Sequence, residues 1–374
     1  MKKARDIFLI TLFTLILLEI ALQLNYYISN GAPLFRRFKT PIYVKDPVYG
    51  HRVKANLKFN HVTNEFNVNY YTNSKGLRCS PKLEEYNGLV NGYRIILNGP
   101  SFAFGWGVNY GQSFAAILEN RLKSGSSFAK QGVQVINFGV PSRSIPIQIK
   151  YLENEGKYYK PALVLQMVYG SMTMGKHDQN KFNDVKDGCL INEKAGYKWI
   201  INEMKQSGIV FYLWIAYNRL LSLVAGNNQD SQIIGAGRDL SNVNKFDIND
   251  KIVSRSLKYY FELKSYCQSI NAKLLIVYFP LSYVLHNEDV TRWKHLGVKN
   301  IPGEIAFNKE YCDYLINNGI DCLILTDDLI KAAQVSRKRL YYWLDVHWTP
   351  YGNEVAAELV SQYLLNQPSI RHSN

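Results

Sequence analysis

The sequence predicts an α/β fold built on a doubly wound, mostly parallel five-stranded sheet and preceded by an N-terminal transmembrane helix. The chain is 374 residues long, which is enough for one large domain with additions. In most of it, short apolar runs without polar alternation are separated by amphipathic segments. Such runs are typical of parallel strands, because helices cover both faces of a parallel sheet. A long apolar stretch lies close to the N-terminus.

The apolar stretch spans residues 7–24 and contains one charge, Glu19. It is about 18 residues long, close to the ~20 that cross the hydrocarbon layer. Basic residues precede it, and Leu24-Asn25-Tyr26-Tyr27 follows where a cleaved signal peptide has small residues. We therefore expect residues 1–29 to be an uncleaved signal anchor that crosses the cell membrane once, with the main domain extracytoplasmic. An amphipathic or core helix is the alternative, although the apolar residues surround the helix rather than forming a stripe.

Two further regions follow the anchor. Residues 30–92 mix polar and β-branched positions with Gly and Pro, which predicts a β-rich lead-in. From residue 93 the alternation of apolar runs and amphipathic segments defines an α/β domain over residues 93–368. The expected strands are residues 94–97, 133–138, 163–168, 273–279 and 322–325, and the expected helices are residues 113–123, 144–159, 252–270, 302–318 and 350–365. A sheet of this kind binds ligands at the C-terminal ends of its strands.

Residues 174–250 interrupt this alternation and are expected to form an insertion. Within it, residues 209–224 are apolar except for Asn218 and Arg219 near the middle. A second membrane span is conceivable, but a charge at the centre of a span costs ~2.5–3.5 kcal/mol. A buried or membrane-leaning helix is therefore favoured.

The charge balance is strongly basic. There are 44 Lys and Arg residues and 30 Asp and Glu residues, a formal net charge of +14, which favours anionic surfaces such as phospholipid or an acidic glycan. No zinc-finger spacing, RNP-like signature or basic zipper accompanies the charge, so neither nucleic-acid binding nor a metal is expected, and no cofactor motif is present. The basic cluster Arg337-Lys338-Arg339 is the expected contact with the anionic surface.

The chain has five cysteines and no Cys-x-x-Cys pair. Five buried thiols are the favoured interpretation. A single bridge, for example from Cys312 to Cys322, is the alternative if the domain lies in an oxidising compartment.

Chemically informative residues follow the first expected strand and precede the last expected helix. The strand leads into Asn98-Gly99-Pro100-Ser101, and a serine just past a strand, between glycines, is placed where a nucleophile is exposed beside backbone N–H groups. Near the C-terminus, Asp345 lies two residues before His347. In an extended segment these side chains point the same way, so the carboxylate can fix the tautomer of the imidazole.

Together, the motifs Gly-x-Ser-Phe-x-Phe-Gly-x-Gly-Val at 99–108 and Asp-x-His-Trp-Thr-Pro-x-Gly-Asn at 345–353 resemble the SGNH/GDSL hydrolase superfamily. The resemblance is to a membrane-anchored bacterial-type member with Gly-Pro-Ser in place of Gly-Asp-Ser. Residues 72–78 (TNSKGLR) and 135–141 (VINFGVP) resemble further blocks of these proteins.

The resemblance implies a three-layer, flavodoxin-like domain with a catalytic triad. It implies Ser101 as nucleophile, His347 as general base and Asp345 as orienting acid. It also implies an oxyanion hole formed at Ser101, at Ser142 in the position of the second-block glycine, and at Ser171 in the position of the third-block asparagine.

Three positions depart from the superfamily pattern. Pro100 removes a carboxylate and an N–H next to the nucleophile. Ser142 still offers an N–H if the backbone turns there without glycine. Ser171 replaces an amide donor with a shorter hydroxyl, and losing one oxyanion donor costs ~10²–10³ in turnover in a protease.

Two functions are consistent with these residues. The first is a membrane-anchored serine esterase or O-acyltransferase that acts on ester groups, with O-acetyl favoured, of an envelope carbohydrate. The alternative is a catalytically degenerate protein of the same fold that binds an acidic glycan or a membrane partner. A distance within ~3.5 Å between Ser101 Oγ and His347 Nε2 favours the enzyme, and about 8 Å or more favours the binding protein.

Aromatic residues accompany the three motifs. Trp106, Tyr169 and Trp348 are placed to stack on sugar rings, with ordinary core packing as the alternative.

Overall fold

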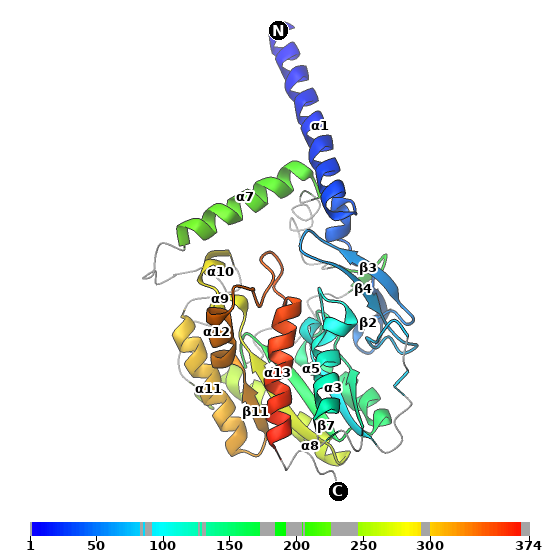
Figure 1. Ribbon diagram of the computed structural model, residues 1–374, viewed down its shortest axis with the longest axis vertical. Coiled ribbons are helices and arrows are strands. Elements are labelled where there is room, and N and C mark those ends of the chain that lie inside the picture. The colour runs from blue at the N-terminus through cyan, green and yellow to red at the C-terminus, as the bar shows by residue number, and fades with distance from the viewer. Residues whose placement is uncertain are drawn as a thin grey trace.

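A computed structural model gives the fold of the chain (Figure 1). It describes residues 2–82, 85–86, 92–125, 128, 132–172, 184–191, 204, 206–225, 246–292 and 300–367. Much of the expected insertion at 174–250, the end of the expected lead-in and residue 368 therefore lie outside the described residues.

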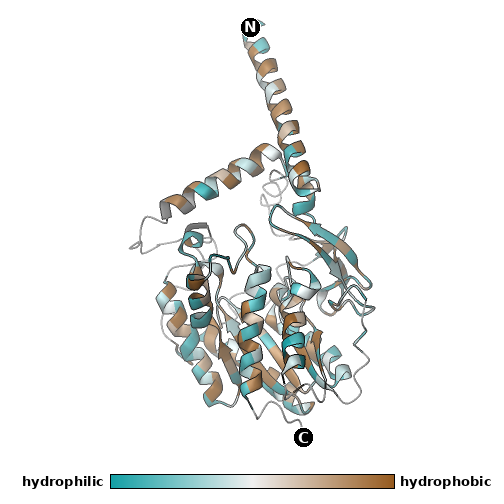
Figure 2. Cartoon of the chain, viewed as in Figure 1, coloured by the Kyte–Doolittle hydropathy of each residue, from teal (hydrophilic) through white to brown (hydrophobic). Residues whose placement is uncertain are grey.

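The long helix α1 (Lys2–Asn30) projects from the rest of the molecule (Figure 1). Most residues between Ile7 and Leu24 are apolar (Figure 2). The side chains from Lys2 to Leu18 are exposed. Of the helices described, α1 is long and apolar enough to cross a membrane, with a mean hydropathy of 2.4 over its most apolar window. A short 3₁₀ helix, η1 (Leu34–Arg37), follows it.

The region expected to be β-rich contains two antiparallel hairpins. They pair β1 (Tyr43–Asp46) with β2 (Gly50–Val53), and β3 (Lys58–Val62) with β4 (Asn67–Tyr71). Residues of both hairpins join a core cluster of the α/β domain, so the hairpins pack directly on that domain.

The central sheet is parallel and has five strands in the order β11-β10-β7-β5-β6. These strands are β5 (Tyr93–Asn98), β6 (Val133–Asn137), β7 (Leu163–Tyr169), β10 (Lys273–Phe279) and β11 (Asp321–Ile324). Numbered along the chain, the order is 2-1-3-4-5, which is the flavodoxin-like arrangement. The sheet confirms the predicted fold class. Strand β6 lies on one side of β5, and β7 lies on the other, so the order in which strands are added reverses between β5 and β7. Such a switch point opens a crevice at the C-terminal ends of the strands.

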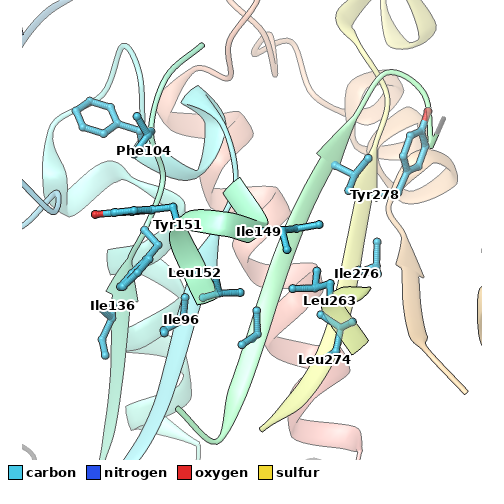
Figure 3. Close-up of a cluster of buried hydrophobic side chains, with 14 of the residues drawn as sticks. Ile96, Phe104, Ile136, Ile149, Tyr151, Leu152, Leu263, Leu274, Ile276 and Tyr278 are labelled. Atoms are coloured by element: carbon cyan, nitrogen blue, oxygen red, sulfur yellow. The ribbon is translucent and has the colours of Figure 1, made fainter. Parts of the chain in front are cut away.

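Helices cover both faces of the sheet. On one face lie α5 (Ile145–Glu155), α8 (Lys251–Ser269) and α11 (Ile301–Asn317); on the other lie α3 (Phe114–Ser124), α12 (Thr326–Val335) and α13 (Pro350–Asn366). Successive strand residues serve opposite faces: Ile96 belongs to the first core, shown in Figure 3, and Ile95 and Leu97 to the second. The strands are apolar throughout because both faces are buried.

The long helices begin at polar side chains that satisfy their first backbone N–H groups. Ser113 caps α3, Asp250 caps α8, Asn300 caps α11 and Thr349 caps α13. These side chains set the helix starts within a residue or two of the positions expected from the sequence. The sequence pattern missed α12 and the short helices α2 (Ser101–Phe104), α9 (Ser282–Leu285) and α10 (Asn287–Arg292).

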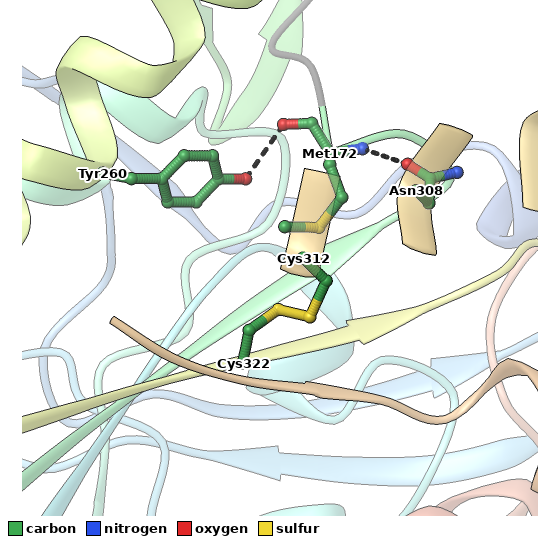
Figure 4. The surroundings of a disulfide bond; sticks show 5 residues. All are labelled: Met172, Tyr260, Asn308, Cys312 and Cys322. Carbon is green, nitrogen blue, oxygen red and sulfur yellow. Dashed lines mark hydrogen bonds between the residues drawn. A yellow bond between two sulfur atoms is a disulfide. The ribbon is translucent and has the colours of Figure 1, made fainter. Parts of the chain in front are cut away.

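The preference for five buried thiols was wrong. Cys312 of α11 and Cys322 of β11 form a disulfide with a Cα–Cα distance of 5.7 Å (Figure 4). Helix α11 packs on the strand that follows it, which brings residues ten apart in sequence within bridging distance. Cys79 and Cys267 are buried and lie outside the disulfide, and Cys189, in the β8–β9 hairpin (Asp184–Lys186 with Cys189–Ile191), is half-buried.

The apolar stretch expected at 209–224 is helix α7 (Gly208–Ala225). It starts beside α1, runs away from it at a wide angle over the domain, and packs against α10 (Figure 1).

Candidate active site

Ser101 lies at the N-terminus of α2, directly after β5 and the turn at Gly99-Pro100. A Cβ atom at residue 99 would come within 3.0 Å of the Cβ atoms of Ala103 and Met167, so the turn has no room for a side chain there. The main chain of Ser101 accepts hydrogen bonds from the N–H groups of Gly105 and Trp106. These bonds hold the serine at the C-terminal edge of the sheet, next to the switch point.

Asp345 and His347 lie in a loop closed by a bridge between Tyr341 and Trp348. Within it, the N–H of Tyr342 donates to the carbonyl of His347 at 3.0 Å. The loop ends at Thr349, whose side chain caps α13. Both side chains therefore sit on a short turn that is fixed at its base by the core and by the last helix.

Ser101, His347 and Asp345 form a continuous hydrogen-bonded series. His347 Nε2 lies 2.5 Å from Ser101 Oγ. His347 Nδ1 is hydrogen-bonded to Asp345 Oδ1, which also accepts the backbone N–H of His347 at 3.0 Å. The Ser101–His347 distance lies within the limit that favours the enzyme hypothesis.

The electrostatics of Asp345 suit a carboxylate that holds an imidazole. Burial by itself would raise the pKa of the Asp345 carboxyl, but the His347 ring and the hydrogen bonds from it outweigh burial and lower the pKa to about 2. Asp345 is therefore ionised at neutral pH, and its charge favours the Nδ1–H tautomer, which leaves Nε2 free to accept the serine proton.

Aromatic rings flank the imidazole of His347. The Phe102 ring lies 4.9 Å from it and the Trp106 ring 5.7 Å from it, centroid to centroid. Trp106 is half-buried and Tyr169 is 41% exposed, so both residues are partly accessible to solvent.

Trp348 does not fit the expected substrate contact. It is 1% exposed, with its ring 4.2 Å from that of Phe279 and 5.2 Å from that of Phe102. Apolar rings of the core surround Trp348, so its ring cannot stack on a sugar. Its position instead fits the alternative of ordinary core packing.

Ser142 and Ser171 follow β6 and β7 at the same edge of the sheet as Ser101. Ser142 has φ = 62°, the left-handed conformation that glycine adopts most easily, so the backbone makes this turn without glycine. The backbone beside Ser171 is held on both sides: Tyr278 donates to the carbonyl of Gly170, and Asn308 accepts the N–H of Met172 (Figure 4). The oxyanion role of these serines stays a prediction.

The β3–β4 hairpin supports the loop of Asp345 and His347 from outside the α/β domain. Glu65, in the turn of this hairpin, accepts the backbone N–H groups of Trp343 at 2.7 Å and Leu344 at 2.9 Å. Burial raises the pKa of the Glu65 carboxyl. Sequence reasoning missed Glu65, because nothing in its local sequence indicates a contact with a loop so distant along the chain.

The TNSKGLR stretch has a structural role beneath the site. Gly76 has φ = 77°, and a Cβ there would lie 2.4 Å from the carbonyl oxygen of Val53. Arg78 is fully buried, donates to the carbonyl of Val108, and stacks on Tyr70 at 4.4 Å. Tyr70 in turn accepts the N–H of Gly107 at 2.9 Å. The stretch thus anchors the glycine-rich loop that follows Ser101.

The basic cluster is only partly available to an anionic partner. Arg339 forms ion pairs with Glu288 and, at 2.6 Å, with Asp289, both in α10. Arg337 and Lys338 are exposed. Among the described residues, no group of three or more His, Cys, Asp or Glu side chains is arranged to hold a metal ion.

Comparisons with known proteins fit this architecture. Residues 246–374 match the sequence model of a family described as SGNH hydrolase-like domain, acetyltransferase AlgX. The matched segment contains Asp345 and His347 but not Ser101. No curated protein matches the chain.

Solved structures similar to the chain include three hydrolases. A GDSL-like lipase from Bacteroides thetaiotaomicron has 11% identity and a TM-score of 0.35, covering 75% of this chain and 93% of the lipase. A lipase/acylhydrolase from Enterococcus faecalis has 14% identity and a TM-score of 0.35, covering 73% and 95%. An alpha/beta hydrolase enzyme from the Lake Arreo metagenome has 11% identity and a TM-score of 0.39, covering 76% and 100%.

The family match covers the C-terminal part of the sheet and the Asp-x-His loop, and the Gly-x-Ser motif is hydrogen-bonded to that loop. The C-terminal part of the chain, residues 246–374, is therefore similar to an SGNH hydrolase-like domain.

Proposed function

We propose that this protein is a membrane-anchored serine esterase or O-acyltransferase that acts on ester groups, foremost O-acetyl groups, of an envelope carbohydrate. The observation that carries the proposal is the hydrogen-bonded series from Ser101 through His347 to Asp345. A serine, an imidazole and an ionised carboxylate in this order are the groups that acyl transfer through a serine ester requires.

The series supports a two-step reaction. Ser101 Oγ attacks the ester carbonyl carbon while its proton passes to His347 Nε2, and the Asp345 carboxylate stabilises the resulting imidazolium. The alcohol leaves with the proton from Nε2, and the acyl group stays on Ser101. Water or a sugar hydroxyl then gives its proton to Nε2 and attacks the acyl carbon. The bond between the acyl carbon and Ser101 Oγ breaks as Oγ takes the proton back from Nε2, which releases the acid or the new ester and restores both Ser101 and His347.

Several features support the setting in the envelope and the kind of substrate. Helix α1 is long and apolar enough for an anchor, and the Cys312–Cys322 disulfide suits an oxidising compartment outside the cytoplasm. The net charge of +14 favours an anionic surface or glycan. The exposed parts of Trp106 and Tyr169 offer aromatic faces beside Ser101 for a sugar ring. The acetyltransferase in the matched family's description supports acetyl as the acyl group.

A hydrolysis assay tests the proposal. We expect the purified full chain to release p-nitrophenol from its acetate ester, and Ser101→Ala to lower the rate by about 10³-fold or more, as loss of a triad serine does. Ser124→Ala is the matched control, because Ser124 is exposed at the end of α3 and bonds only to its own helix. Equal rates in Ser101→Ala and the unaltered protein would refute Ser101 as the nucleophile.

A binding protein of the same fold is the second candidate, and Pro100 and Ser171 favour it. A protein that binds a glycan without chemistry should turn over neither this ester nor an acetylated polysaccharide, while still retaining the polysaccharide in a pull-down. Turnover that depends on Ser101 excludes it.

A further inference from the structure

Helix α7 exposes apolar side chains on the face where a soluble helix exposes polar ones. Leu213, Tyr217, Leu220 and Leu223 are 66%, 60%, 61% and 71% exposed among the residues that the structure describes. They recur every three or four residues and so form one stripe along the helix. We call these four residues the α7 stripe. With 18 residues, α7 is about 27 Å long.

The opposite face of α7 is fixed to the base of the proposed anchor. Phe211 is 1% exposed and clusters with Tyr26 of α1 and Leu34 of η1, with the rings of Phe211 and Tyr26 5.5 Å apart. Asn218, two turns further along the same side, is also buried. Because the helix repeats every 3.6 residues, the α7 stripe lies on the side opposite Phe211 and Asn218, away from η1.

Polar contacts set the level at which α7 joins α1. Glu19 accepts the N–H groups of Gly208 at 2.7 Å and Ile209 at 3.0 Å, and the hydroxyl of Ser207 at 2.7 Å. Gln23, one turn further on, donates to the carbonyl of Gln206 at 2.7 Å. The one acidic residue of the apolar stretch thus caps the first turn of α7, where the helix dipole favours a negative charge.

This level corresponds to one surface of a bilayer. The apolar stretch of α1, residues 7–24, is about 27 Å long, close to the ~30 Å hydrocarbon core. Glu19 lies about 8 Å before the end of this stretch, so α7, which starts beside Glu19, lies near the boundary between acyl chains and headgroups. At this boundary lipid buries the apolar face of a helix, which is favourable, whereas in water the same face would stay exposed.

The far end of α7 is connected to the candidate site. It packs against α10, whose Glu288 and Asp289 hold Arg339, six residues before Asp345. Helix α13, which follows the catalytic loop, begins on the side of the domain that faces α7 (Figure 1). The C-terminal edge of the sheet, with Ser101, therefore faces the same way as the surface on which α7 would lie.

We propose that α7 lies on the membrane surface with the α7 stripe inserted among the lipids, so that α1 and α7 together hold Ser101 toward the bilayer. The proposal rests on the proposed anchoring through α1. A lipid bilayer is favoured over a protein partner because the stripe continues from a helix that is itself suited to lipid, and because the net charge of +14 favours anionic headgroups.

Fluorescence quenching in vesicles tests this placement. The full chain is reconstituted into phosphatidylglycerol and phosphatidylcholine vesicles with one introduced cysteine carrying a nitrobenzoxadiazole label. The background is Cys189→Ser, in which the native cysteines outside the disulfide, Cys79 and Cys267, are buried. The labelled variants are Leu220→Cys in the α7 stripe, Ile10→Cys in α1, and Tyr158→Cys, 72% exposed in η3 (Gly156–Tyr159), which follows α5 at the opposite edge of the sheet. All three positions are exposed, so the substitutions remove no core contact.

The expected result is strong quenching of the 220 and 10 labels by lipids with nitroxide on their acyl chains, and little quenching of the 158 label. Aqueous iodide should give the reverse order. A 220 label quenched by iodide as strongly as the 158 label, with the 10 label quenched by lipid, would overturn the α7 proposal while the anchor stands. This result would favour a protein partner on the stripe. If the nitroxide lipids quench neither the label at residue 10 nor the label at residue 220, the proposed anchor fails as well.

Discussion

At the scale of single residues, the candidate site depends on contacts between side chains far apart in the sequence. Ser101 and His347 are 246 positions apart, yet their reacting atoms are 2.5 Å apart. The contact forms because β5 and the last loop end at the same edge of the sheet. Parallel strands bring their C-terminal ends together, so residues from separate βα units converge there.

Replacing Asp345 tests the role of the carboxylate. We expect Asp345→Asn to lower kcat for an acetate ester by about 10⁴-fold at neutral pH, because an amide no longer favours the tautomer that leaves His347 Nε2 free. Asp328→Asn, at an exposed position of α12, is the control that should keep full activity. Steady-state kinetics of the two variants check this, and similar values for both would contradict the assigned role.

The depressed pKa of Asp345 sets the pH range of its contribution. The pKa of the Asp345 carboxyl is about 2 in the folded protein, below the ordinary pKa of an aspartate near 4. The contribution of the ionised Asp345 carboxylate to the free energy of unfolding is therefore complete above about pH 4. It disappears as the pH falls toward 2. Between unaltered protein and Asp345→Asn, the difference in melting temperature should shrink over this interval. A constant difference from pH 6 to pH 2 would contradict the assignment.

Glu65 is predicted to position the catalytic loop without touching the substrate. Glu65→Ala removes the acceptor for the N–H groups of Trp343 and Leu344, and a loop displaced by about 1 Å loses activity by about 10²-fold. We expect the loss in kcat, with KM little changed. Glu65→Gln keeps an acceptor oxygen and should restore most of the rate. If both variants lose kcat equally, positioning by this hydrogen bond is the wrong explanation.

Sequence reasoning reached some of these residues and not others. Ser101, Asp345 and His347 were identified because their motifs are local and lie at strand or helix ends. Glu65 could not be identified, because its function is a contact between a hairpin turn and a loop. Trp348 was misassigned for a related reason: its place in a motif gives no information on whether its ring faces solvent or core.

At the scale of elements, helix α2 carries Ser101 and leaves no room around its backbone. A Cβ atom added to Gly139, just past β6, would lie 2.2 Å from the backbone nitrogen of Phe104. Close packing of this kind fixes the helix relative to the sheet, and Ser101 with it.

We therefore expect Gly139→Ala to displace α2, with a stability loss of about 1–3 kcal/mol and a fall in esterase rate. Gly111→Ala is the matched control, because no heavy atom lies within 4 Å of a Cβ atom there. Thermal denaturation and the ester assay on both variants test this. An unchanged rate in Gly139→Ala would mean that α2 tolerates the shift.

The elements themselves were predictable where one physical signal dominates. The strands followed from apolar runs because both faces of the sheet are buried, and the helices near them from capping residues and periodicity. Helix α12 was missed because it is short and follows β11 directly, with no capping side chain at Leu325. Only tertiary packing distinguished the alternatives for α7, since its composition suits a core helix and a membrane helix alike.

At the scale of the whole molecule, α1, α7 and the disulfide suggest one orientation relative to a membrane. The basic residues at the start of α1 favour a cytoplasmic N-terminus, and the Cys312–Cys322 bridge favours an external domain.

Cysteine accessibility in intact cells tests this orientation. In a Cys189→Ser background, Tyr158→Cys should react with a membrane-impermeant maleimide added outside, because position 158 is exposed on the proposed external domain. Lys3→Cys should react only after the cells are broken, since it lies on the proposed cytoplasmic side. The opposite pattern would reverse the topology.

The most direct test of the central claim, that Ser101 is an activated nucleophile, is covalent labelling with a fluorophosphonate probe followed by peptide mass spectrometry. Only a serine whose hydroxyl is activated by a neighbouring base reacts readily with such a probe. We predict a single adduct on the peptide that contains Ser101, absent in Ser101→Ala and strongly reduced in His347→Ala. A folded, unaltered protein that takes up no probe at Ser101, or takes it up equally without His347, would contradict the account.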